Sequence, residues 1–185
     1  MKFLKLILII FISINTSVKA ESKKKLIQDL KEGGRLIFIR HAYAPGGGDP
    51  DNFSINDCST QRNLSKSGKI QSEKIGNFFI QNEIKINKIY SSLWCRCKET
   101  ASIAFKNYET KSFLNSFFSP KFKNNKKTQI VNFKKFLLEW DEKTNLIFVT
   151  HYVVISEILG YPSSSGEIVI SDKNLKIIDT LQTEY

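Results

Sequence analysis

The chain has 185 residues, and its 28 Lys and Arg against 18 Asp and Glu give a formal charge of +10. This length suits a single domain with its own hydrophobic core, and a hydrophobic content of 41% excludes an intrinsically disordered protein. The sequence has no repeat of roughly 20–50 residues and no heptad pattern, which excludes solenoids and coiled coils.

The first 20 residues are typical of a secretory signal peptide. Two lysines precede an apolar run, Leu6–Ile14, which is shorter than the about 20 residues that a helix needs to cross a bilayer. Val18 and Ala20 are small residues two positions apart and fit a signal-peptidase site. We expect export to the periplasm, cleavage after Ala20 and a domain over residues 21–185 with no membrane span. The alternatives are an uncleaved anchor or a buried first helix.

Strands and helices are predicted to alternate along the rest of the chain. The predicted strands are at 35–40, 86–91, 111–114 and 145–150, with a final hairpin at 167–170 and 175–181. The predicted helices are at 21–31, from the cap at 65 to 82, at 95–104, at 128–140 with Thr128 as its cap, and at 153–159. A long loop is predicted at 42–63. This order predicts a three-layer α/β/α sandwich with a mostly parallel central sheet. Ligands of such sheets bind at the carboxyl ends of the strands.

Both histidines of the chain stand at the carboxyl end of a predicted strand. His41 and His151 each follow an apolar run of strand length, so their imidazoles are expected at one edge of the sheet. Arg40 precedes the first histidine, and Arg96 follows the second strand after a short loop. One such histidine is more often structural, but two at equivalent positions favour a shared site.

Arginine is rare in this chain, with four residues against 24 lysines. Arginine at positions 40 and 96 therefore indicates bidentate binding of a carboxylate or a phosphate rather than a surface ion pair. No carboxylate lies in the same motifs, so a phosphoryl group is the expected occupant. One imidazole could attack phosphorus and form a phosphohistidine. The arginines and a protonated second histidine could then stabilise the charged oxygens without a metal or cofactor.

Four segments carry these residues in a recognisable pattern. Leu36–His41, followed by Ala42 where a glycine is usual, resembles the "RHG" motif of the histidine phosphatase (phosphoglycerate-mutase-like) superfamily. Residues 62–71 resemble its "LTxxGxxQA" helix, residues 90–101 its "SxxxRxxxTA" segment and residues 148–151 its "VTH" motif. The four matches fall in the order of the family.

The resemblance implies that His41 is the phosphorylated nucleophile. Arg40, Arg96 and His151 would complete the phosphate pocket, with Arg62 at its entrance. It also implies the three-layer fold and a phosphatase for small metabolites, sugar phosphates or phosphohistidine proteins. Exported members include enzymes that act on heptose phosphate of the lipopolysaccharide core, so we expect a small phosphorylated substrate or a phosphorylated envelope component.

The chain departs from the family pattern at the general acid. Many branches carry a Glu after the third strand, whereas residues 113–118 hold no carboxylate here, and an alkoxide leaves poorly without an acid. Asp49, Asp51 or Asp57 of the long loop could supply the proton, although Asp in loops more often forms turns. We therefore expect a phosphatase without a strong acid rather than a mutase.

Three cysteines, Cys58, Cys95 and Cys97, remain after export. In an oxidising compartment one pair would form a disulfide. We expect Cys58 to pair with Cys95 or Cys97, because Cys95 and Cys97 are too close in sequence to bridge each other easily. No second Cys or His pair at zinc spacing accompanies them, so no metal is expected.

Other classes of function are kept or excluded on specific residues. The absent Glu keeps a non-catalytic binding protein for phosphate or a phosphorylated ligand as the alternative.

A metal bound by both histidines is disfavoured because the flanking arginines repel a cation. Removal of three lysines with the signal peptide leaves +7 (+10 minus 3). The densest basic group, Lys121–Lys127, contains Phe122 but lacks the pattern of aromatic and Arg residues that stacks on nucleic acid, so a solvated loop is predicted there. The Gly46–Gly48 triplet lacks the Gly-Lys-Ser/Thr ending of a Walker motif.

Overall fold

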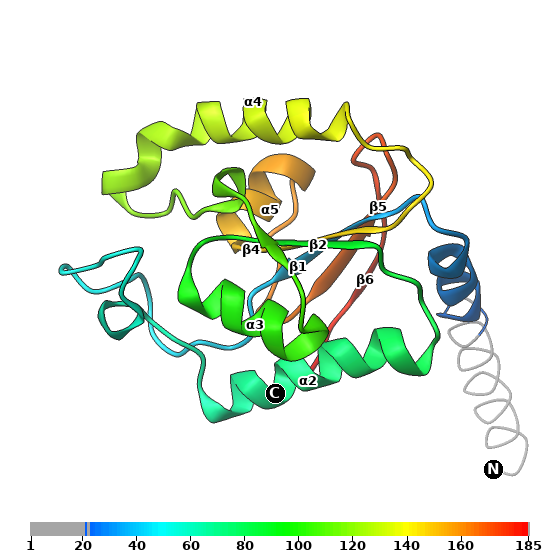
Figure 1. Cartoon of the computed structure of the whole chain (residues 1–185), viewed down its shortest axis with the longest axis horizontal. Coiled ribbons are helices and arrows are strands. Elements are labelled where there is room, and N and C mark those ends of the chain that lie inside the picture. Colours follow the sequence, from blue (N-terminus) through cyan, green and yellow to red (C-terminus); the bar gives the residue numbers. More distant parts are fainter. Residues whose placement is uncertain (1–20, 22, 185) are drawn as a thin grey trace, which may run out of the picture.

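The computed structural model describes residues 21 and 23–184 (Figure 1). Its centre is a six-stranded sheet in the order β3-β2-β4-β1-β5-β6. The first four strands in this order are parallel, β5 is antiparallel to β1, and β6 is antiparallel to β5. The strands are β1 (Leu36–Arg40), β2 (Lys88–Ser91), β3 (Glu109–Thr110), β4 (Leu146–Thr150), β5 (Ile168–Ser171) and β6 (Ile177–Leu181).

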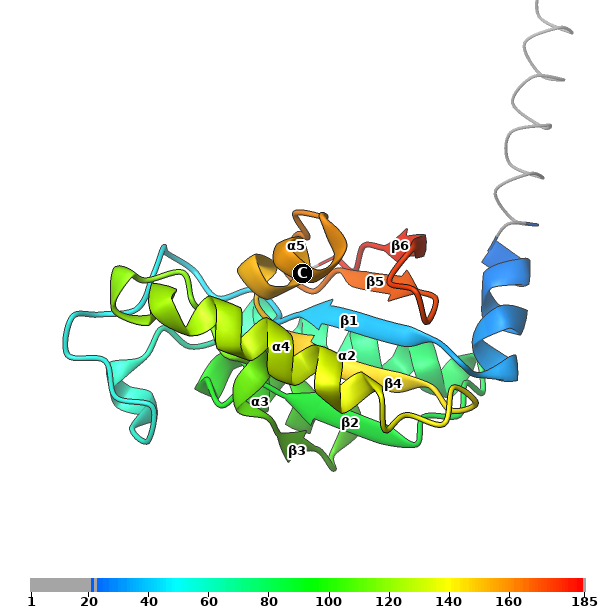
Figure 2. The same ribbon diagram turned by 90° about the horizontal axis from the view of Figure 1, so that it is seen from above.

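Helices cover both faces of this sheet, which confirms the predicted three-layer sandwich (Figures 1 and 2). One face carries α2 (Lys66–Gln81) and α3 (Cys95–Phe105), and the other carries α4 (Lys126–Leu137) and α5 (Tyr152–Leu159). A helix over residues 23–32 precedes β1. The predicted signal peptide and its cleavage after Ala20 lie outside the described residues. Within residues 21 and 23–184, no helix has the length and apolar character needed to cross a membrane.

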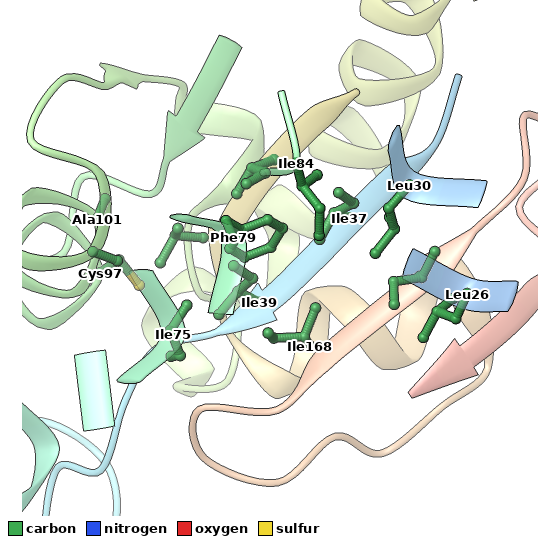
Figure 3. Close-up of a cluster of buried hydrophobic side chains, with 14 of the residues drawn as sticks. Leu26, Leu30, Ile37, Ile39, Ile75, Phe79, Ile84, Cys97, Ala101 and Ile168 are labelled. Carbon is green, nitrogen blue, oxygen red and sulfur yellow. The ribbon is translucent and has the colours of Figure 1, made fainter. Parts of the chain in front are cut away.

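The central strands are buried on both faces, as their continuous apolar runs predict. Because successive side chains of a strand point to opposite faces, Ile37 and Ile39 of β1 pack toward α2 and α3 (Figure 3). Leu36 and Phe38 pack toward α4 and α5 instead. The sheet thus separates two hydrophobic cores, which pack against both faces of β1 and β4.

The start of α2 fixes the segment that follows β1. The side chain of Ser65 accepts a hydrogen bond from the Gly68 N–H, a typical helix N-cap. A Cβ added to Gly68 would lie 2.0 Å from the Tyr43 carbonyl oxygen, so only glycine allows this close approach. The Gln71 side chain accepts from the Tyr43 N–H at 2.8 Å and donates to the Ser165 carbonyl at 2.9 Å. The "LTxxGxxQA" segment therefore positions the chain after His41.

Two predicted elements differ from the structure between β2 and α4. The strand expected at 111–114 lies at Glu109–Thr110, because only these residues pair with β2, and Ser112–Leu114 forms a 3₁₀ turn, η2. The helix expected at 128–140 runs instead from Lys126 to Leu137. Its N-cap residue, Asn125, makes no side-chain capping bond, so a capping residue does not mark the start.

The basic segment Lys121–Lys127 is helical rather than a loop. It comprises most of a 3₁₀ helix, η3 (Pro120–Asn125), and the first residues of α4. Its lysines are exposed, but Phe122 is half-buried and its ring lies 5.5 Å from that of Trp94. This aromatic contact orders the segment beside the carboxyl edge of the sheet.

Candidate active site

A pocket of about 130 Å³ lies at the carboxyl ends of β1 and β4. It brings together five of the residues predicted from the sequence, together with one of the three candidate acids. The lining residues are Arg40, His41, Gly46, Gly47, Gly48, Asp49, Arg62, Trp94, Arg96, Ser116, Phe118, Ser119, Phe122, His151 and Tyr152. Asp51 and Asp57 do not line it. This lining combines three guanidinium groups, two imidazoles and one carboxylate.

His41 is buried and held through both its backbone and its ring. Its N–H donates to the Thr150 carbonyl at 2.9 Å, which ties the end of β1 to β4. Its Nδ1 lies 2.8 Å from the Ala42 carbonyl oxygen. Because a carbonyl only accepts, Nδ1 carries the proton and Nε2 bears the free lone pair. Burial, followed by the charge of Arg96, holds the pKa of His41 well below its usual value of 6.5.

His151 lies beside His41, with ring centroids 5.5 Å apart and ring planes inclined by 68°. Its Nε2 lies 2.9 Å from the Ser92 hydroxyl and 3.5 Å from the Cys97 sulfur. Burial and then the charge of Arg96 hold the pKa of His151 well below 6.5. The protonated second histidine expected from the sequence therefore requires an anion that offsets the neighbouring cations.

Arg40 is fixed at the pocket wall by contacts that leave part of its guanidinium unused. One terminal nitrogen donates to the Ser163 carbonyl at 2.8 Å, and the guanidinium lies 5.2 Å from the centre of the Tyr152 ring. Its Nε is buried without a hydrogen-bond partner. Burial is the main cause of a lowered pKa for this group.

Arg96 is paired with a carboxylate that lies outside the matched motifs, so the pocket is not purely cationic. Its two terminal nitrogens lie 2.6 and 3.2 Å from the two oxygens of Asp49, a bidentate arrangement in a side chain only 3% exposed. The Nε of Arg96 is buried without a partner. The sequence could not indicate this pair, because the two residues are 47 positions apart.

Asp49 is also held by two further donors. The Trp94 indole N–H donates to it at 2.9 Å, and the Arg62 N–H donates at 3.1 Å. Burial favours the neutral carboxyl, but the hydrogen bonds and charge of Arg96 outweigh it, so the pKa of Asp49 lies below its usual value. In this position Asp49 is an ionised acceptor rather than an acid.

The two other candidate acids lie outside the pocket. Asp51 is exposed. Asp57 is exposed and caps the 3₁₀ turn η1 (Cys58–Thr60), accepting from the Ser59 N–H at 2.9 Å and the Ser59 hydroxyl at 2.7 Å. These bonds hold the pKa of Asp57 below its usual value. It has the turn-forming role that is common for Asp in loops.

Arg62 supports the glycine-rich part of the loop. Its Nε donates to the Gly48 carbonyl at 2.8 Å, and a terminal nitrogen donates to the Ala44 carbonyl. Burial, with the charge of Arg96, lowers its pKa to about 10. Arg62 therefore contributes charge to the pocket and shapes the segment that carries Asp49.

The structure pairs Cys58 with Cys95, at a Cα–Cα distance of 5.7 Å, and leaves Cys97 free. Cys97 is buried against His151, and burial raises its pKa to about 12. The disulfide ties the long loop to the first residue of α3, next to Arg96. Among residues 21 and 23–184, no three His, Cys, Asp or Glu side chains lie close enough to hold a metal ion.

The segment where many family members carry a Glu contributes no carboxylate. Asn115 accepts from the Leu93 N–H at 2.9 Å and the Ser92 hydroxyl at 3.2 Å, and Ser116 lines the pocket. Asp49 is thus the single carboxylate among the described lining residues.

Several positioning residues lay within the matched motifs but were not singled out from the sequence. Thr100 accepts from the Ala42 N–H at 3.0 Å and donates to the Arg96 carbonyl at 2.7 Å, which joins the two halves of the site. Ser92 and Trp94 contact His151. By contrast, nothing in the sequence pointed to Phe118 and Tyr152, whose rings lie 5.9 Å apart at the pocket.

No family model matches the chain, and no curated protein matches it by sequence. Solved structures do match its fold. The TTHB049 structure from Thermus thermophilus has a TM-score of 0.57 at 15% identity and covers 82% of this chain and 97% of its own. A protein histidine phosphatase SixA complexed with tungstate has a TM-score of 0.52 at 13% identity, covering 81% and 96%. A phosphoglycerate mutase from Thermus thermophilus has a TM-score of 0.53 at 15% identity, covering 81% and 99%. The chain therefore has the fold of these solved structures, as the resemblance in its sequence implied.

Proposed function

We propose that the protein is a phosphatase that hydrolyses a phosphomonoester or phosphoramidate through a covalent phosphohistidine on His41. The observation that carries this proposal is the hydrogen bond from Nδ1 to the Ala42 carbonyl. It leaves Nε2 as the nucleophilic nitrogen in a pocket lined by Arg40, Arg62 and Arg96. A neutral imidazole among fixed cations suits attack on a phosphoryl group.

In the first step, the lone pair of His41 Nε2 forms a bond to phosphorus while the bond from phosphorus to the leaving group breaks. The charge that develops on the phosphoryl oxygens is stabilised by Arg40, Arg96 and His151. In the second step, a water oxygen attacks the phosphohistidine and the electron pair of the P–N bond returns to Nε2. Inorganic phosphate and the free imidazole are the products.

This chemistry needs no metal or cofactor, because the arginines supply the positive charge. The SixA structure with the same fold contains tungstate, an oxyanion similar to phosphate. The three arginines that line the pocket of this chain suit such an oxyanion, which supports the proposal of a small phosphorylated substrate.

We further propose that the protein acts after export, with the signal peptide removed after Ala20. The Cys58–Cys95 disulfide supports this location, because disulfides persist in oxidising compartments such as the periplasm. A phosphorylated envelope component or a small periplasmic phosphate ester would then be the substrate.

Hydrolysis of an aryl phosphate by the purified protein in EDTA tests the activity, with His41→Ala as the test variant and Arg35→Lys as the control. Arg35 pairs with Asp29 and does not line the pocket. We expect turnover in EDTA that the control retains and His41→Ala loses. No turnover by the wild type, with phosphate still raising its melting temperature, would instead indicate the alternative, a non-catalytic phosphate-binding protein.

A further inference from the structure

Asp49 occupies the bidentate edge of Arg96 that is formed by its two terminal nitrogens. Carboxylate and phosphate bind a guanidinium with the same parallel pair of N–H···O bonds. The Asp49 oxygens lie 2.6 and 3.2 Å from the terminal nitrogens of Arg96. A substrate phosphoryl group held by these two nitrogens would therefore have to replace the carboxylate.

The charges of the pocket favour such a replacement. Arg40, Arg62 and Arg96 all line it, and Asp49 is the one carboxylate among the described lining residues. The buried Nε atoms of Arg40 and Arg96 have no hydrogen-bond partner. A phosphoryl dianion carries more charge and more acceptor oxygens than the carboxylate, so it satisfies this cluster better.

The chain before Asp49 is suited to movement. Gly46 and Gly48 have positive φ angles of 89° and 73°. A Cβ added to Gly47 or Gly48 would meet no atom within 4 Å, so no neighbour blocks a shift of these residues on that side, although Arg62 binds the Gly48 carbonyl. The Cys58–Cys95 disulfide limits how far the loop can travel from α3. Asp49 can thus leave Arg96 and remain near the pocket.

Resting on the proposed function, we propose that Asp49 occupies the phosphoryl site of the free enzyme, is displaced by the substrate and then protonates the leaving oxygen. When the Asp49 carboxylate is displaced, it loses its contact with the Arg96 guanidinium and lies beside a phosphoryl dianion instead. Loss of the cation and proximity of like charge both favour the protonated carboxyl. The charged and titratable groups that line the pocket with Asp49 are Arg96 of α3, Arg40 and Arg62, and His41 and His151 at the strand ends. Trp94, the N-cap residue of α3, donates to Asp49.

The displaced Asp49 carboxylate takes up one proton from solvent as the substrate binds, and the proton balance then closes over the two steps. As the P–O bond of the substrate breaks, its electron pair goes to the leaving oxygen, which takes the proton of the Asp49 carboxyl and departs as an alcohol. In the second step the Asp49 carboxylate accepts a proton from the attacking water. The carboxyl is thereby restored, and it ionises again when phosphate leaves and Asp49 returns to Arg96.

Binding of inorganic phosphate to the full-length protein tests the displacement, measured by calorimetry on wild type and Asp49→Asn. Asp57→Asn is the matched control, since Asp57 is an exposed carboxylate of the same loop. We expect Asp49→Asn to bind phosphate about tenfold or more tightly than wild type, because no carboxylate competes. The control should be unchanged. Equal or weaker binding by Asp49→Asn would overturn the proposal and make Asp49 an orienting partner of Arg96.

Trp94→Phe keeps the test open if Asp49→Asn does not fold. It removes the indole N–H bond to Asp49 and retains an aromatic ring beside Phe53 and His151. A carboxylate held by one bond fewer is displaced more easily, so phosphate should again bind more tightly, by a smaller factor. Weaker or unchanged binding by this variant, once circular dichroism shows a native fold, would also overturn the displacement.

The acid role is tested by comparing two leaving groups. For Asp49→Asn we expect kcat/KM to fall about 100-fold more with an alkyl phosphate than with a nitrophenyl phosphate, whose leaving group needs little protonation. An equal fall with both would overturn the acid role. Failure of the proposed function looks different. Wild type would turn over neither substrate, while the phosphate affinities would still differ between wild type and Asp49→Asn.

Discussion

The carbonyl oxygen of Tyr43 lies 2.0 Å from the position that a Cβ would take on Gly68. This relationship links the fold to the site, because Tyr43 is two residues after the proposed nucleophile and Gly68 is in the first turn of α2. The helix thus holds the chain that leaves β1 against the sheet edge.

Gly68→Ala should destabilise the protein for this reason. The added methyl meets rigid backbone, and overpacking of this kind costs about 1–3 kcal/mol of unfolding free energy. Gly47→Ala is the control, because a Cβ there meets nothing within 4 Å. Urea unfolding measures both variants. A Gly68→Ala variant as stable as Gly47→Ala would contradict the close packing of α2 on this segment.

Reduction of the Cys58–Cys95 disulfide should lower the stability of the protein, and the buried thiol of Cys97 should have no part in this effect. The Cys58–Cys95 bridge spans 37 residues, and loss of such a bridge costs about 2–4 kcal/mol. Cys58 is exposed, so dithiothreitol should reach it. We expect reductant to lower the melting temperature of wild type and Cys97→Ala alike and to leave Cys58→Ser unaffected. Insensitivity of Cys97→Ala to reductant would show that Cys97 is the true partner of Cys58.

We expect kcat/KM to stay nearly constant when the pH falls below the usual pKa of histidine. Burial and the three arginines lower the pKa of His41 well below 6.5, so the neutral nucleophile persists as the pH falls. We expect kcat/KM for a nitrophenyl phosphate to stay within about twofold between pH 7.5 and 6. An ordinary histidine would lose about three-quarters of its neutral form over this range. A fall centred on pH 6.5 would contradict the assigned environment of His41.

Substitution of lysine for an arginine of the pocket should lower the activity. It supplies the charge but cannot form the bidentate fork, and loss of one transition-state donor lowers rates by about 10²–10³-fold. We expect losses of this size in kcat/KM for Arg40→Lys and Arg96→Lys, measured on an aryl phosphate. Arg35→Lys, at the opposite end of β1, should retain full activity. Near-normal rates in Arg96→Lys would argue against a role in phosphoryl binding.

The central fold could be predicted from sequence where burial leaves a strong pattern. β1 and β4 are buried on both faces and therefore read as continuous apolar runs. One end of each of two helices was predictable from a capping residue. Ser65 is the N-cap of α2, and Gly160 ends α5 in a left-handed conformation. The positions of both histidines at one sheet edge followed from these elements alone.

Other features depend on contacts that no local pattern records. β3 has two exposed residues and no apolar signature. The choice between Cys95 and Cys97 depends on which face of α3 meets the long loop, since Cys97 packs against Thr150 and His151 instead. The pairing of Asp49 with Arg96 joins a loop to a helix across the fold, so composition suggested bare cations where the structure has an ion pair.

The most direct test of the account is to trap the covalent intermediate. The protein would be mixed with excess nitrophenyl phosphate, quenched in alkali during the first turnovers and mapped by mass spectrometry. The account predicts phosphate on His41, absent from the His41→Ala protein treated in the same way. Rapid turnover with phosphate on another residue, or with no phosphorylated protein under a quench that preserves phosphohistidine, would contradict it.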